Sequence, residues 1–118
     1  MMVNVYGIPN CDTVKKALSW LKENNIAFEF HDFKKEGISA NKIKEWVNAS
    51  TLEKVLNKKS IAFRGLSAED QQKTSHKVEA IKLMEANTNL IKRPVVEIAG
   101  IILHGFNESA FTNAFGKN

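Results

Sequence analysis

The chain has 118 residues, of which 43% are hydrophobic, and it carries a formal charge of +4. This length suits one domain, and the hydrophobic content is enough to bury a core without disulfides or a structural metal. The seventeen basic residues are scattered or paired among thirteen acids, which argues against direct nucleic-acid binding. A single cysteine, no charged and apolar leader and no apolar run of about 18 residues predict a cytoplasmic protein without a membrane segment, and we expect a monomer.

The N-terminal quarter of the chain predicts a strand, a helix and a second strand. Val3 and Val5 lie in a short apolar strand, which Gly7 and Pro9 end. The next two elements follow from apolar spacings that fit a helix and then a strand: Val14, Ala17, Leu18 and Leu21, followed by Ile26, Phe28 and Phe30. Such a βαβ unit predicts parallel strands with a right-handed crossover.

The middle of the chain is predicted to be helical. The expected helices, in chain order, are one capped by Ser39 with Ile43, Trp46 and Val47 on its apolar face, a short one opened by Thr51 with Leu52, Val55 and Leu56, and one over about residues 75–86 with Val78, Ile81 and Met84. The polar stretch at 58–65 is expected to be a loop whose Ile61 and Phe63 side chains are available for packing.

The C-terminal part predicts a β-hairpin and a last helix. Two β-rich segments, 94–98 and 101–104, flank Ala99-Gly100, and Asn107 caps a helix with Phe111 and Phe115 on one face. The order βαβ, helices, ββα is the arrangement of a thioredoxin-like α/β fold with an inserted helical subdomain. We expect one domain over 1–118, with its core at about 1–36 and 88–118 and the helical insertion at about 37–87.

The position of Cys11 makes it the main candidate for chemistry. It lies between the first strand and the first helix, where unpaired N–H groups and the helix dipole favour a thiolate. Asp12 opposes that effect, and Lys15 and Lys16 partly offset it. A lone intracellular cysteine is more often a small buried hydrophobe, so a structural thiol remains the alternative. Asn10 is read either as the helix cap or as an amide donor to substrate.

The remaining candidates are rare residue types. Arg64 and Arg93 are the two arginines among the seventeen basic residues, and a guanidinium binds oxyanions with two parallel hydrogen bonds; they could also be surface charges. The three histidines, His31, His76 and His104, do not have the spacing of a metal site, so we expect no metal and read them as structural or surface residues.

Four segments carry a family resemblance along the whole chain. They are Tyr6-Gly7-Ile8-Pro9-Asn10-Cys11-Asp12-Thr13-Val14-Lys15-Lys16-Ala17, then Ile26 to Phe33, then Ile91-Lys92-Arg93-Pro94, and then Gly105-Phe106-Asn107. In this order and spacing they resemble the arsenate-reductase-like family, in particular its small YffB branch, with the Spx regulators as close cousins. The resemblance implies a thioredoxin-like core with a helical insertion, a reactive thiol at Cys11, Arg64 and Arg93 facing that thiol, and a cis peptide bond between Arg93 and Pro94.

The chain departs from the family pattern at two places. Position 14 holds Val14, so the chain lacks the Cys-x-x-Cys pair that many Spx regulators use as a disulfide switch, and an external thiol must resolve an oxidised Cys11. Arsenate reductases of this class also use a third arginine after the hairpin, and no arginine follows Arg93 here. Arsenate is therefore questionable as the substrate.

The sequence thus predicts a thiol-dependent reductase with Cys11 as the nucleophile. Arg64, Arg93, Asn10 and Pro94 are expected to bind the substrate, which is a small oxyanion or a mixed disulfide. No cofactor is expected to be bound; glutathione or a similar thiol is the expected co-substrate, with a glutaredoxin-type protein as a recycling partner. The alternative is an Spx-like regulatory protein that binds RNA polymerase without turnover.

Overall fold

The computed structural model describes residues 2–117, which divide into two compact units. Residues 2–36 and 93–117 form one unit, and residues 37–92 form the other. Residues 88–92, expected in the core, thus belong with the helical unit. Their backbone explains this, because Asn57 N–H donates to the Leu90 carbonyl at 2.8 Å and Lys92 N–H donates to the Val55 carbonyl at 2.7 Å.

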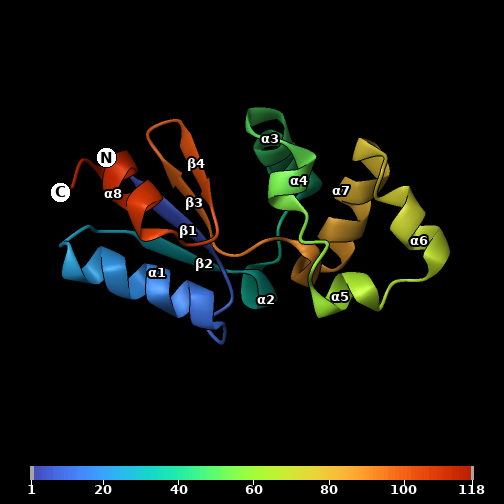
Figure 1. Cartoon of the computed structure of the whole chain (residues 1–118), viewed down its shortest axis with the longest axis horizontal. Helices are drawn as coiled ribbons and strands as arrows, with labels where there is room; N and C mark the ends of the chain where they lie inside the picture. The colour runs from blue at the N-terminus through green and yellow to red at the C-terminus, as the bar shows by residue number, and fades with distance from the viewer. Residues whose placement is uncertain (1, 118) are drawn as a thin grey trace. The chain divides into compact units, whose positions relative to one another are not determined.

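The first unit contains a four-stranded sheet in the order β2-β1-β3-β4 (Figure 1). Its elements are β1 (Val3–Gly7), α1 (Asp12–Glu23), β2 (Glu29–Asp32), the short α2 (Phe33–Glu36), β3 (Val95–Ile98), β4 (Ile101–His104) and α8 (Glu108–Phe115). Strand β1 pairs in parallel with β2 and antiparallel with β3, and β3 pairs antiparallel with β4. The predicted βαβ unit, hairpin and α/β fold class are confirmed.

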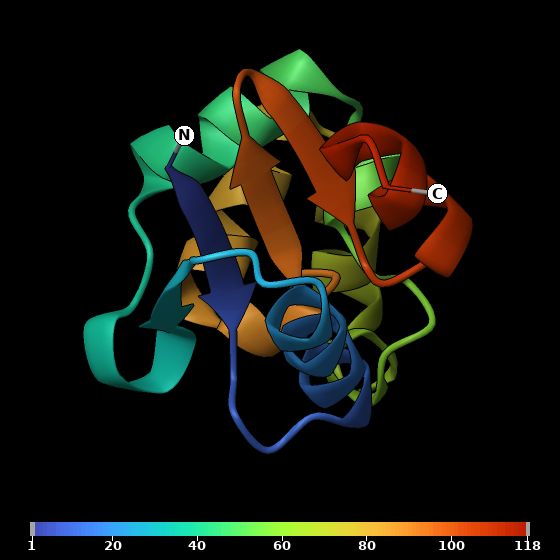
Figure 2. The same cartoon turned by 90° about the vertical axis from the view of Figure 1, so that its left-hand side faces the viewer.

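The core of this unit lies between one face of the sheet and the helices α1 and α8 (Figure 2). Strand register aligns a row of apolar residues across that face: Phe30, Val5, Val96 and Leu103. From the helices, the ring of Trp20 meets the ring of Phe111 edge to face at 5.5 Å between centroids. An aromatic pair of this geometry stabilises packing beyond the area that it buries.

The second unit is helical. It contains α3 (Ala40–Ala49), α4 (Leu52–Val55), α5 (Ile61–Arg64), α6 (Ala68–Lys73), α7 (Lys77–Ala86) and a 3-10 turn, η1 (Thr88–Leu90). Helices α3 and α7 pack against each other. Trp46 of α3 and Met84 of α7 are fully buried. Ser39 and Thr51 cap α3 and α4 as predicted, since their side-chain oxygens accept the N–H groups of Lys42 and Lys54.

Two predictions for the helical unit are wrong. The stretch at 58–65 is not all loop, because the Ser60 hydroxyl oxygen accepts the Phe63 N–H at 3.0 Å and starts the single turn α5. Ile61, whose side chain was expected to be available for packing, is 82% exposed. In α7 the buried face consists of Ala80, Ile81 and Met84, whereas Val78 is 64% exposed. Ala80 completes a helical face that the larger residues alone did not identify.

None of the helices among the described residues combines the length and apolar character needed to cross a membrane.

Candidate active site at the start of helix α1

Cys11 is the N-cap residue of α1. Its side chain is half-buried and its thiol is free. Its backbone is extended, with φ −145° and ψ 123°, while its carbonyl oxygen accepts the Lys15 N–H at 2.9 Å and so begins the helix. The N–H groups of the first turn have no partners within the helix. The fold therefore places Cys11 at the N-terminal end of α1, which is the positive end of the helix dipole, and this position at a helix start agrees with the sequence pattern.

Asn10 does not cap α1, so that reading is wrong. Asn10 is exposed, Cys11 occupies the N-cap position, and this helix start has no side-chain hydrogen bond within the described part of the chain. The physical reason lies in the register of α1, which begins one residue later than a cap at Asn10 requires. The other reading of Asn10, an amide donor to substrate, stays a prediction.

Pro94 lies near the end of β1, just before the loop between β1 and α1 that carries Cys11 (the thiol loop). The Arg93-Pro94 peptide bond is cis, as the resemblance implied. A Cβ built on Gly7 would lie 2.9 Å from Val14 Cγ2 and 3.9 Å from Pro94 Cα. Gly7 thus allows the first turn of α1 and Pro94 to approach the same point of β1. This contact gathers Pro94 and the start of the Cys11 helix at one end of the sheet.

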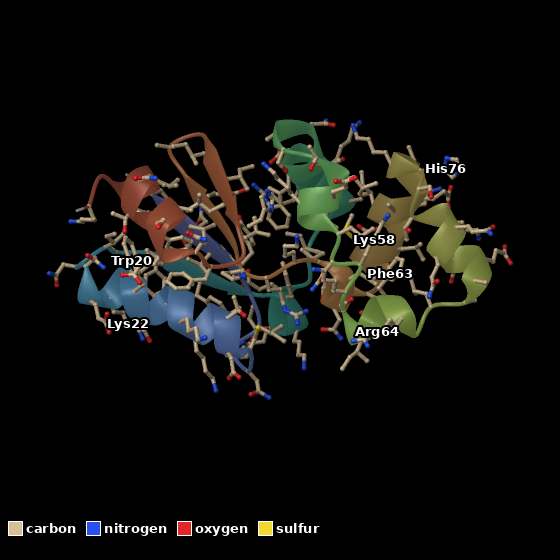
Figure 3. All side chains as sticks on the ribbon, in the orientation of Figure 1. Trp20, Lys22, Lys58, Phe63, Arg64 and His76 are labelled. Carbon is tan, nitrogen blue, oxygen red and sulfur yellow. The ribbon has the colours of Figure 1, made fainter. Side chains whose placement is uncertain are left out.

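The two arginines stand in different surroundings. Arg93 directly precedes Pro94, is half-buried, and its Nε atom is inaccessible to solvent. It is therefore held at the sheet end that carries the thiol loop. Arg64 belongs to the helical unit, at the end of α5, where its exposed side chain donates to the Lys59 carbonyl at 3.4 Å (Figure 3). A role for Arg64 beside Cys11 stays a prediction.

The segment after β4 also returns to this end of the sheet. Gly105 has a φ of +75°, which favours glycine, and its N–H donates to the Pro94 carbonyl at 2.8 Å. The next residue, Phe106, packs edge to face on Phe111 at 4.9 Å between ring centroids. From the sequence, this segment was known as part of the family resemblance, as the cap of the last helix at Asn107, and as the place of a missing arginine. The glycine after the hairpin was the signal for its return to Pro94.

The histidines lie in separate surroundings. His31 stacks on Tyr6 at 4.6 Å between ring centroids, and its Nε2 lies 3.0 Å from Asn4 Oδ1. His104 pairs in the sheet with Val95, and His76 is exposed at the start of α7. Among residues 2–117 there is no group of three or more His, Cys, Asp or Glu residues that could hold a metal ion.

Several known proteins are similar to this chain over most of its length. The ArsC family model matches residues 6–114. An uncharacterised protein of Haemophilus influenzae is 40% identical over 115 residues, covering 97% of this chain and 99% of that protein. A YffB protein of known structure is 38% identical with a TM-score of 0.89, covering 95% of this chain and 97% of the other.

The regulators of the same superfamily are more distant. Global transcriptional regulator Spx 1 of Oceanobacillus iheyensis is 28% identical over 109 residues, covering 91% of this chain and 82% of the regulator. The similarity to each of these proteins extends over most of both chains, and the family model includes the thiol loop, the helical unit and the segment around Pro94. The chain belongs to the ArsC family.

Proposed function

We propose that the protein is a thiol-dependent reductase that acts through Cys11. One observation carries this proposal: the N-cap residue of α1 is a cysteine with a half-buried, free thiol. It follows the end of β1, where the lack of a side chain on Gly7 allows Pro94 to approach. Helix starts of this kind favour the thiolate, which is the nucleophilic form of cysteine. We expect this reductase to work in the cytoplasm, because a glutathione-type pool keeps thiols reduced there. A chain with one cysteine has no internal disulfide that such a pool would break.

The proposed reaction is two successive thiol–disulfide exchanges. The Cys11 thiolate attacks the glutathione sulfur of a mixed disulfide, the S–S bond breaks, and the substrate sulfur leaves as a thiolate that takes up a proton. A second glutathione, as thiolate, then attacks the Cys11–glutathione disulfide, which releases oxidised glutathione and regenerates the Cys11 thiolate. Overall, the mixed disulfide and one glutathione become the free substrate thiol and oxidised glutathione, so one disulfide bond breaks and one forms.

The other proposed substrate-binding residues are Arg93, Arg64, Asn10 and Pro94, of which the two arginines bind the negative charge of the substrate. Arg93 is held next to Pro94 at the thiol end of the sheet, so its guanidinium is suited to a carboxylate or an oxyanion. We assign Arg64, Asn10 and Pro94 the same task of substrate binding. A glutaredoxin-type protein is a suitable recycling partner, because it resolves glutathione mixed disulfides.

Arsenate is expected to be a poor substrate. No arginine follows Arg93, and the segment that returns to Pro94 reads Gly105-Phe106-Asn107. The loss of one guanidinium from an oxyanion site costs about 1.5–3 kcal/mol, or roughly 10- to 100-fold in rate. We expect the purified protein, with glutathione and a glutaredoxin system, to reduce a glutathione mixed disulfide faster than arsenate. Cys11→Ser must abolish both reactions.

A second candidate function is favoured by the similarity to Spx 1 of Oceanobacillus iheyensis, which is a transcriptional regulator by name. Under this alternative the protein binds RNA polymerase and does not turn over a substrate. Val14 argues against a redox-controlled version, because no second thiol exists to close an internal disulfide. Turnover of neither substrate, together with an RNA polymerase complex that survives Cys11→Ser, would replace the reductase with the regulator.

A further inference from the structure

Helix α5, which ends at Arg64, has little packing to hold it in place. It consists of the four residues Ile61–Arg64, and none of its side chains is buried. A single helical turn fixes several backbone dihedrals for very few hydrogen bonds, so it is not stable in water by itself. The position of Arg64 therefore depends on the hydrogen bonds that tie the two ends of α5 to the rest of the helical unit.

The N-terminal end of α5 is held by Ser60. Its hydroxyl oxygen accepts the Phe63 N–H at 3.0 Å, and its O–H donates to the Asn57 carbonyl at 2.7 Å. Bonds of this kind stabilise a helix start. Both join residues that are three positions apart in the chain, so they do not attach the end of α5 that carries Arg64.

The C-terminal end of α5 is held by Gln71 of α6. The side-chain Nε2 of Gln71 donates to the Phe63 carbonyl at 3.2 Å and to the Leu66 carbonyl at 3.4 Å. Phe63 precedes Arg64 in the chain and Leu66 follows it (Figure 3). A side-chain amide has two donor hydrogens, and both acceptors here are carbonyl oxygens, which settles the direction in which the amide faces. One side chain thus binds the backbone on both sides of Arg64.

Gln71 is itself anchored without any contribution from α5. Its N–H donates to the Ser67 carbonyl at 2.9 Å, at the start of α6. Its carbonyl accepts the hydroxyl of Thr74, a residue that is only 2% exposed. The Gln71 side chain is half-buried, which shields its two hydrogen bonds from water and strengthens them. Gln71 therefore offers α5 a fixed point of attachment.

We propose that Gln71 is a positioning residue that holds Arg64 for substrate binding. Its two hydrogen bonds fix the backbone around Arg64, so the guanidinium loses less conformational freedom when it binds a negatively charged substrate. Without these bonds Arg64 keeps its charge but not its preorganised position. The inference rests on the proposed role of Arg64 in substrate binding and deepens it, because it names the residue through which the fold supports that role.

The first test measures the two hydrogen bonds without any chemistry. Gln71→Met keeps the length and helix propensity of the side chain but removes both donors. Gln72→Met is the matched control, because Gln72 is exposed and points in another direction from the same helix. The amides of Gly65 and Leu66 donate to carbonyls of α5, and we expect their hydrogen exchange to be about 3- to 10-fold faster in Gln71→Met. Exchange at wild-type rates in this variant would overturn the proposal.

The second test measures turnover of a glutathione mixed disulfide. We expect Gln71→Met to raise the KM for the mixed disulfide about 3- to 10-fold while kcat stays unchanged, because Arg64 binds the ground state and the transition state alike. Gln72→Met should change neither constant. In an Arg64→Ala background, Gln71→Met should have no further effect on KM, whereas a general structural role would persist there.

Three outcomes separate this proposal from the reductase function. A wild-type KM in Gln71→Met would overturn the positioning role and leave the reductase function intact. Additive effects of Gln71→Met and Arg64→Ala would also overturn it, because Gln71 would then act on the reaction without Arg64. Absence of turnover in the wild-type protein would overturn the reductase function and, with it, this role of Gln71.

Discussion

Helix α1, which carries the thiol, begins differently from the first helices of the helical unit. In that unit α3, α4, α5 and α6 each begin at a Ser or Thr whose side-chain oxygen accepts an N–H group of the first turn. Helix α1 begins at Cys11 without such a bond. The helical unit therefore stabilises its helix starts by local hydrogen bonds, whereas the start of α1 is not stabilised in this way.

Packing compensates for the missing cap of α1. Val14, Ala17 and Leu21 are fully buried along one face of the helix, and Trp20 meets Phe111 of α8. By contrast, none of the side chains of α5 and α6 is buried. Most helix stability in proteins comes from an amphipathic face rather than from local propensity. A helix anchored in the core can thus leave its first N–H groups available to a thiolate, while a single exposed turn depends on its cap.

Cys11→Ser should have the largest effect on activity. It converts the start of α1 into the kind used in the helical unit. The backbone angles of Cys11, −145° and 123°, nearly equal those of Asn107, −141° and 119°, whose side chain caps α8. We expect turnover to be lost completely and the free energy of unfolding to rise by about 0.5–1 kcal/mol, because serine is a favoured N-cap residue. Enzyme assays and urea unfolding on the same sample check both effects.

Each half of this prediction has its own control. Cys11→Ala also removes the nucleophile but adds no cap, so it should be inactive without the gain in stability. Residual turnover in Cys11→Ser would show that another group performs the chemistry. A stability of Cys11→Ser equal to that of Cys11→Ala would show that the start of α1 cannot accept a side-chain cap.

Arg93 and Arg64 allow a second comparison between the units. We expect Arg93→Ala to lower kcat/KM for a glutathione mixed disulfide roughly 10- to 100-fold, since a charge-assisted hydrogen bond contributes about 1.5–3 kcal/mol. Arg93→Lys should recover activity only in part, because an ammonium cannot form two parallel contacts. Arg64→Ala and Arg64→Lys, measured in the same assay, test independently whether Arg64 binds the substrate. Full activity in both Lys variants would reduce the arginines to general positive charge.

The sequence predicted the elements in which apolar residues recur at a regular helical or strand spacing. Helix α1 and β1 follow from residue spacing, and a second strand was predicted correctly, although β2 begins only at Glu29, after Ile26 and Phe28. Ser39, Thr51 and Asn107 act as caps where they were expected. The short helices α5 and α6, of four and six residues, were not predicted. Each consists of only a few residues with no buried side chain, so neither has a periodic apolar signal, and only the serine before each marks its start.

The site was predictable in part for a similar reason. The position of Cys11 at a helix start follows from the local sequence, because strand and helix patterns flank it. The return of Gly105 to Pro94 continues the register of the predicted hairpin, whereas the approach of Pro94 to Gly7 is a contact between residues far apart in the chain. No local spacing encodes such a contact, and the resemblance alone indicated that Pro94 belongs to the site.

Gly7→Ala tests the close contact at the thiol end of the sheet. The added Cβ would lie 2.9 Å from Val14 Cγ2, and a valine in a helix has essentially one side-chain rotamer available. We expect overpacking to cost about 1–3 kcal/mol of unfolding free energy and to slow alkylation of the Cys11 thiol. The cost should shrink in a Val14→Ala background, which a double-mutant cycle measures. Equal costs in both backgrounds would locate the strain elsewhere.

Ser39→Ala should produce the smallest effect, and it tests the helical side of the comparison. The Ser39 oxygen accepts the Lys42 N–H at 3.1 Å, and α3 carries the fully buried Trp46. Loss of this cap should lower the unfolding free energy by about 1 kcal/mol, whereas Ser39→Gly should cost only a few tenths, because glycine leaves the helix end open to water. Urea unfolding followed by tryptophan fluorescence separates the two variants. Turnover should be unchanged in both, since α1 has its own packing. Equal stability of Ser39→Ala and wild type would mean that α3, like α1, is held by its buried face alone, and the contrast between the two kinds of helix start would disappear.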